Sequence, residues 1–163
     1  MNTFKLTYEI GKGGWALFAI DINGEKFEFN VSYLFDSLGD LTLKTLHLLQ
    51  HEKYDGSASF VDEPGEFHLC LERTKKECVQ ITGKWSDEYT GWENIDLTSM
   101  KLKTLFTVEI SPLIFAQEVI TNLDKIYSTY GLSGYKARWK NHHFPNAHYL
   151  KLKEVFNESN NTK

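Results

Sequence analysis

Residues 15–31, WALFAIDINGEKFEFNV, decide the fold of the first part of the chain. Residues 15–22 are apolar and favour strands, and Asn23-Gly24 follows them directly. An Asn-Gly pair between two such runs is a strong signal for a two-residue β-hairpin. On the return strand, Phe27, Phe29 and Val31 fall on one face because side chains alternate along a strand. The stretch therefore predicts two antiparallel strands with a common buried face.

The residues before and after this hairpin predict one further strand and one helix. Residues 3–10 alternate between apolar and polar side chains, which indicates a third, half-buried strand. From Ser32 to about His51 the leucines recur at helical spacing, with Asp36 and Asp40 early and basic side chains late. This pattern predicts a first helix directly after the strands.

The second half of the chain repeats the order of strands followed by helix. Four further strands are predicted at residues 57–61, 66–73, 78–85 and 100–110. Ser111-Pro112 is a favourable helix start, and Gly131 is the expected end of that helix. A shorter helix is expected after Pro145.

This order predicts an α+β fold. We expect one antiparallel β-sheet of about six to seven strands, packed by two main helices and a short C-terminal helix. Residues 1–157 are expected to form a single domain, and residues 158–163 a disordered tail.

Composition narrows the classes of protein. Of the 163 residues, 41% are hydrophobic and 14% aromatic, which excludes a disordered chain. No apolar run approaches the roughly 18 residues of a membrane span, and the N-terminus lacks the features of a signal peptide. Two cysteines without an export signal indicate a reducing compartment. We therefore expect a cytoplasmic protein that does not contact a membrane.

Charge is unevenly distributed along the chain. The net charge is −4, yet residues 52–96 hold eleven acids against five bases, and residues 136–153 hold five bases and no acid. Only two of the 18 basic residues are Arg, the side chain best suited to phosphates and guanine edges. Nucleic-acid binding is therefore not expected, and the acidic middle of the chain would suit a basic partner.

Histidines and cysteines could in principle form metal or redox sites. His47 and His51 share a helix face but have no third ligand, so a solvated pair is expected. His142, His143 and His148 are expected in a surface loop, and Cys70 in the core behind an apolar strand face with Cys78 on the next strand. We expect no metal and no cofactor.

An enzymatic site has little support in the sequence. No nucleophile-elbow, dinucleotide or kinase motif is present, so no catalytic residue is assigned and the protein is not expected to be an enzyme. A hydrolase built on His68 with Glu66 or Asp62 is the remaining enzymatic hypothesis. It would require an activity that is lost on His68→Ala.

Residues 85–96, WSDEYTGWENID, form the most distinctive segment. It contains two Trp, one Tyr and four acids without a base, a composition typical of binding surfaces. The alternative is that the Trp side chains cap the core while the acids are solvated. The contacts expected for a partner are Trp85, Asp87, Glu88, Tyr89, Trp92 and Glu93, followed by Asp62, Glu63 and Glu66, which surround a Pro-Gly turn and are expected to be solvated.

Three short motifs resemble a known group of proteins. They are SYLFDSLGDL at residues 32–41, DEPGEF at residues 62–67 and Phe144-Pro145. Together they resemble small bacterial proteins related to immunity proteins of polymorphic and contact-dependent growth inhibition toxin systems. No catalytic residues come with this resemblance, and the motifs themselves suit helix capping and turns.

The resemblance implies an immunity protein that binds and neutralises a cognate toxin domain, here a basic, nuclease-like one encoded next to it. Such a protein needs no chemistry of its own. The alternative is a small-ligand-binding domain with an aromatic-lined pocket between sheet and helices, which 14% aromatic residues would permit. The oligomeric state stays open.

Overall fold

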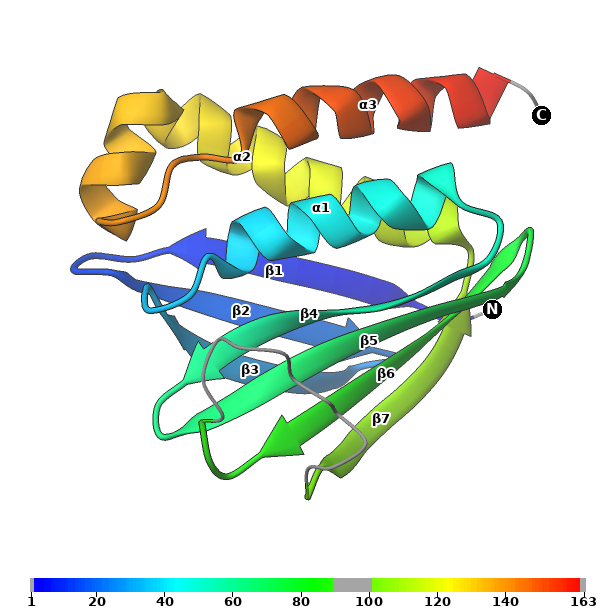
Figure 1. Cartoon of the computed structure of the whole chain (residues 1–163), viewed down its shortest axis with the longest axis horizontal. Helices are drawn as coiled ribbons and strands as arrows, with labels where there is room; N and C mark the ends of the chain where they lie inside the picture. Colours follow the sequence, from blue (N-terminus) through cyan, green and yellow to red (C-terminus); the bar gives the residue numbers. More distant parts are fainter. Residues whose placement is uncertain (1, 90–100, 162–163) are drawn as a thin grey trace.

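The computed structural model describes residues 2–89 and 101–161 (Figure 1). The elements in chain order are β1 (Phe4–Ile10), β2 (Trp15–Ile22), β3 (Glu25–Ser32), α1 (Ser37–Gln50), β4 (Tyr54–Asp62), β5 (Gly65–Lys75), β6 (Cys78–Ser86), β7 (Lys103–Ile110), α2 (Pro112–Trp139) and α3 (Asn146–Asn161). The predicted α+β class and the predicted hairpin at Asn23-Gly24 are confirmed. None of the helices in these ranges is long and apolar enough to cross a membrane.

The strands form two antiparallel sheets, so the expectation of one sheet is wrong. One sheet has the order β1-β2-β3 and the other the order β4-β5-β6-β7. The chain leaves β3 for α1 before β4 begins, which starts a new sheet. Between the two edges, the backbone N–H of Asn30 on β3 donates to the Asp62 carboxylate on β4, at 3.1 Å. In a continuous sheet, β3 and β4 would be joined by backbone hydrogen bonds. Here a hydrogen bond to a side chain links the two strands instead.

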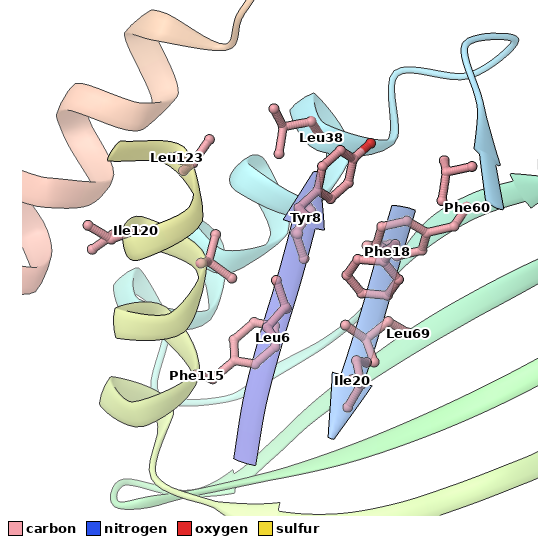
Figure 2. Packing of buried hydrophobic residues seen from close by; sticks show 14 of the residues in the cluster. Leu6, Tyr8, Phe18, Ile20, Leu38, Phe60, Leu69, Phe115, Ile120 and Leu123 are labelled. Atoms are coloured by element: carbon pink, nitrogen blue, oxygen red, sulfur yellow. The ribbon is translucent and has the colours of Figure 1, made fainter. Parts of the chain in front are cut away.

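Phenylalanine rings fill the space between the two sheets. Phe18 stacks on Phe60 and Phe29 stacks on Phe67, each with ring centroids 4.0 Å apart. Figure 2 shows the Phe18 and Phe60 rings side by side within the cluster of buried residues. In each pair one ring belongs to the three-stranded sheet and the other to the four-stranded sheet. The two stacked pairs therefore hold the sheets face to face.

The three helices lie together on one side of the sheets (Figure 1). Helix α2 packs on β1 and α1 on β4, and α3 contacts both helices. Asn122 of α2 closes the edge of β1, because its amide accepts from the Tyr8 N–H at 2.8 Å and donates to the Leu6 carbonyl at 2.9 Å. An edge strand paired in this way has fewer free groups for another strand.

The helices depart from their predicted bounds. Helix α1 begins at Ser37 rather than near Ser32, because Asp36 is its N-cap and accepts from the Gly39 N–H. Gly131 ends the first helical part of α2, as predicted, because its φ of 61° and ψ of −170° are not helical, and a second helical part follows it and reaches Trp139. Helix α3 has 16 residues and reaches Asn161, so it is not short, and residues 158–161 of the expected tail are helical.

Candidate functional site

Two acidic segments that the sequence presents separately meet at one end of the molecule (Figure 1). They are the β4–β5 turn and the end of β6. Strand β5 brings them together, because Glu66 pairs with Ser86 and the Tyr89 N–H donates to the Pro64 carbonyl at 2.8 Å. We call this region the acidic corner, defined as Asp62, Glu63, Glu66, Trp85, Asp87, Glu88 and Tyr89. Trp92 and Glu93, also predicted as contacts, lie outside the described residues.

Three carboxylates of the acidic corner face solvent: Glu63, Asp87 and Glu88 are exposed. The chain holds the last of these in place through a local turn. The Ser86 hydroxyl donates to the Glu88 carbonyl at 2.8 Å, and the Glu88 N–H lies 3.3 Å from the same hydroxyl. The corner therefore presents negative charge from a defined backbone.

Asp62 is half-buried, although its place beside the Pro-Gly turn had predicted a solvated side chain. Burial raises the pKa of its carboxyl, and the hydrogen bond from the Asn30 N–H opposes that shift. Its position between the two sheets makes Asp62 a link between β3 and β4.

Glu66 is 2% exposed, so the expectation that it is solvated is wrong. Strand β5 begins at Gly65, which places Glu66 on the strand rather than in the turn. Its carboxylate lies 3.6 Å from Nε2 of His68, and Nδ1 of His68 lies 3.1 Å from the Ser59 hydroxyl. The result is a buried row of Ser59, His68 and Glu66 across β4 and β5.

This row has the residue types of a hydrolase triad, and the sequence did not indicate the part that Ser59 takes. The signal that could have found it is the strand register, which sets Ser59 opposite His68. Burial, with the nearby Lys84 charge, lowers the pKa of His68 to about 4, so His68 is neutral at pH 7. All three side chains are buried, and an inaccessible serine beside a weakly basic histidine is unsuited to nucleophilic attack.

Trp85 caps the core, as one of the two interpretations of its segment proposed. Its ring lies parallel to that of Phe29, with centroids 5.9 Å apart and an interplanar angle of 18°. A side chain at Gly65 would collide with the Trp85 ring, so a glycine is needed at that point of the hairpin. The indole N–H donates to the Asp87 carboxylate at 2.8 Å, which ties the core to the acidic corner.

Tyr89 is half-buried beside the acidic turn. Burial raises the pKa of its phenol, and the charges of Glu66 and Glu63 raise it further. The phenol is therefore protonated at neutral pH and can donate a hydrogen bond.

The other candidate clusters form no metal site within the described ranges. His47 and His51 lie with ring centroids 6.0 Å apart, and no group of three His, Cys, Asp or Glu there could hold a metal ion. His142 contacts the Tyr33 carbonyl at 2.8 Å, and His143 lies 3.0 Å from the Lys136 ammonium. Their ring nitrogens thus contact protein groups.

Cys70 does not lie in the core, contrary to expectation. Leu69 and Leu71 point inward and are fully buried, so alternation places Cys70 on the outer face of β5 beside His68. It is half-buried, its pKa is raised by burial, and both Cys70 and Cys78 are free thiols.

A groove of about 790 Å³ lies between α1 and residues 141–148. Asp36, Gly39 and Asp40 line it from one side and Phe144-Pro145 from the other, so two of the three sequence motifs meet there. Side chains such as Tyr8, Phe18 and Leu38 occupy the space between sheets and helices (Figure 2), where an aromatic-lined pocket had been expected. Small-ligand binding stays a prediction.

Comparison with known proteins identifies no relative. No family model matches the chain, and no curated protein or solved structure is detectably similar to it.

Proposed function

We propose that this chain is an immunity protein that binds and neutralises a cognate toxin domain with a basic surface, and that the acidic corner is its contact region. The observation that carries the proposal is the meeting of the β4–β5 turn with the end of β6. This meeting concentrates the exposed carboxylates of Glu63, Asp87 and Glu88 beside Tyr89. The three sequence motifs described above also support it.

Charge and aromatic area have different roles in such a contact. Exposed carboxylates speed the encounter with a basic partner and exclude acidic ones. A tyrosine or tryptophan at the centre of an interface contributes much of the affinity, and its truncation can cost 2 kcal/mol or more. Trp92, in the same sequence segment, is the second such side chain, and Trp92→Ala should weaken binding at least tenfold.

Neutralisation on this proposal requires no reaction by the immunity protein. Ser59, His68 and Glu66, the residues with the strongest resemblance to a catalytic set, are buried and support the strands. The protein would act by covering the toxin, in the cytoplasm where the toxin acts.

The test is co-expression with the tagged C-terminal domain of the protein encoded immediately upstream. We expect a stable complex and toxicity when this chain is omitted. In the double variant Glu63→Lys/Glu88→Lys, affinity should fall at least tenfold at low salt. The matched control is Glu25→Lys/Glu52→Lys, which reverses two exposed carboxylates outside the acidic corner.

The outcomes separate three cases. No complex and no toxicity would contradict the proposal and favour the small-ligand hypothesis, for which a ligand should raise the melting temperature. A complex equally weakened by both double variants would show only an effect of net charge. A complex weakened only by the corner variant would place the contact at the acidic corner.

A further inference from the structure

A cluster of positive charge lies at the same end of the molecule as the acidic corner. Two of the five bases in residues 136–153 are paired, since Lys151 lies 2.8 Å from Glu154 and Lys153 lies 3.0 Å from Asp124. The other three, with Lys12 of the β1–β2 turn, have no carboxylate within 4.0 Å in the described ranges. We call Lys12, Lys136, Arg138 and Lys140 the cationic end.

Contacts with the rest of the fold bring these four residues together. The Gly14 N–H donates to the Arg138 carbonyl at 3.0 Å, and the Arg138 guanidinium donates to the Gly11 carbonyl at 3.3 Å. These bonds join the turn that holds Lys12 to the last part of α2. The cationic end is thus built from two segments more than 100 residues apart in the sequence.

Aromatic rings position two of the charged groups. The Arg138 guanidinium lies 4.6 Å from the centre of the Tyr130 ring, and the Lys140 ammonium lies 4.6 Å from the centre of the Tyr33 ring. Such contacts are attractive because the face of an aromatic ring carries partial negative charge. Because these two side chains are already ordered in the free protein, less conformational entropy is lost when a partner binds them.

Apolar side chains are exposed beside the charges. Trp15 is 43% exposed and follows Gly14 directly, and Leu34 is 37% exposed and follows Tyr33. A groove of about 550 Å³ is lined by Leu132, Lys136 and other residues of the same helix end. Exposed aromatic and aliphatic groups surrounded by charge are typical of protein–protein contact surfaces.

The cationic end and the acidic corner are close enough for one partner to cover both. The Lys140 ammonium contacts Tyr33, and Asn30, three residues earlier, bonds Asp62 of the acidic corner. The backbone from Asn30 to Tyr33 spans at most about 10 Å, so this segment links the two regions at one end of the molecule. A standard interface covers about 800 Å² of each protein and is roughly 30 Å across.

We infer that the cationic end is a second part of the toxin contact and binds an acidic patch next to the toxin's basic surface. The inference rests on the proposed function and specifies the partner as bipolar. A protein partner fits better than nucleic acid, because phosphates bound at the cationic end would be repelled by the exposed carboxylates at the same end of the molecule (Figure 1). Two opposite charge patches also fix the orientation in which the partner docks.

The test uses the same co-expressed toxin domain and the double variant Lys12→Glu/Lys136→Glu. Both side chains are exposed, and neither takes part in the cation–ring contacts described above. The matched control is Lys75→Glu/Lys76→Glu, two exposed lysines at the end of β5 and in the β5–β6 turn, at the opposite end of the molecule (Figure 1). At about 50 mM salt we expect at least tenfold weaker binding for the first variant and less than about threefold for the control, with the difference shrinking at high salt.

Each result supports or overturns a specific statement. If the wild-type protein forms no complex, the proposed function fails and this inference fails with it. If the complex forms but both double variants bind equally well, only the inference is overturned. The last measurement is sedimentation of the protein alone at low salt. A dimer that Lys12→Glu/Lys136→Glu abolishes would show that the cationic end binds a second copy of this chain, and would overturn the inference.

Discussion

Over residues 66–69 both faces of β5 are buried, but their chemistry is opposite. On the inner face, Phe67, Leu69 and Leu71 are fully buried against the other sheet and the neighbouring strands. On the outer face, Glu66 and His68 are just as inaccessible, yet both are polar. The same strand thus buries an apolar row and a polar row.

This difference in chemistry indicates that one face of β5 stabilises the fold and that the other positions the strand ends. Burying apolar surface stabilises the fold by roughly 25 cal/mol per Å², whereas a buried polar group is costly unless it is hydrogen-bonded. The hydrogen bond between His68 Nδ1 and the Ser59 hydroxyl offsets part of that cost, whereas Nε2 lies 3.6 Å from Glu66, too far for a hydrogen bond. The inner face therefore supplies most of the stability, and the outer face fixes the strand ends that form the acidic corner.

The largest effect is expected on the inner face. Phe67→Ala removes a ring stacked on Phe29 and in contact with Phe60, and should cost about 3–5 kcal/mol of unfolding free energy. Urea denaturation measures the loss. Phe27→Ala, which removes a ring that is only partly buried, is the matched control and should cost less. A loss below about 1 kcal/mol for Phe67→Ala would contradict the assignment of stability to the inner face.

The next effect is a pH dependence of the outer face. His68 has a pKa of about 4 in the folded protein against 6.5 for an ordinary histidine. Between these values the unfolded state binds the proton and the folded state does not, so stability falls as the pH falls from about 6.5 to 4. The total loss from this group is about 3 kcal/mol.

His68→Gln should remove this part of the acid sensitivity, measured as unfolding free energy at pH 7, 5.5 and 4. Burial raises the pKa of Asp36, Asp40 and Asp62, and this shift acts in the opposite direction, so wild type and variant must be compared at each pH. Ser59→Ala is the control, because it keeps the buried imidazole and should keep the steep dependence. Parallel pH curves for wild type and His68→Gln would contradict a buried neutral histidine.

Much of the strand pattern could be predicted, because alternation of apolar and polar side chains is a local property. It separates Phe67 and Leu69 from His68, and turn signals such as Asn23-Gly24 and Pro64-Gly65 set the hairpins. Alternation does not reveal whether the second face of a strand is covered. For this reason Glu66 was expected in solvent. Cys70 was expected in the core for a different reason, since its apolar neighbours were given more weight than the alternation that places it on the face opposite to Leu69 and Leu71.

The acidic corner was predicted only as two separate groups of residues. Local sequence shows that residues 62–66 and 85–89 are acidic and aromatic, but their contact depends on the register of β5 against β6. The break into two sheets was missed for a similar reason, since it depends on how Asp62 meets the edge of β3. Both features are contacts between segments distant in sequence, which no local period encodes.

The smallest effect is expected at Trp85, which connects the inner face with the acidic corner. Trp85→Phe keeps an aromatic ring beside Phe29 but removes the N–H that bonds Asp87. Loss of this one exposed hydrogen bond should cost about 1 kcal/mol of unfolding free energy or less, measured in urea. Asp87→Asn, which keeps an acceptor oxygen for the indole, should cost less. Because the bond also holds Asp87 in the acidic corner, Trp85→Phe should weaken the proposed toxin complex more than it weakens the fold. A loss of stability as large as that of Phe67→Ala would instead make Trp85 an ordinary core residue, and would remove the distinction between the face that stabilises the protein and the residues that present its charge.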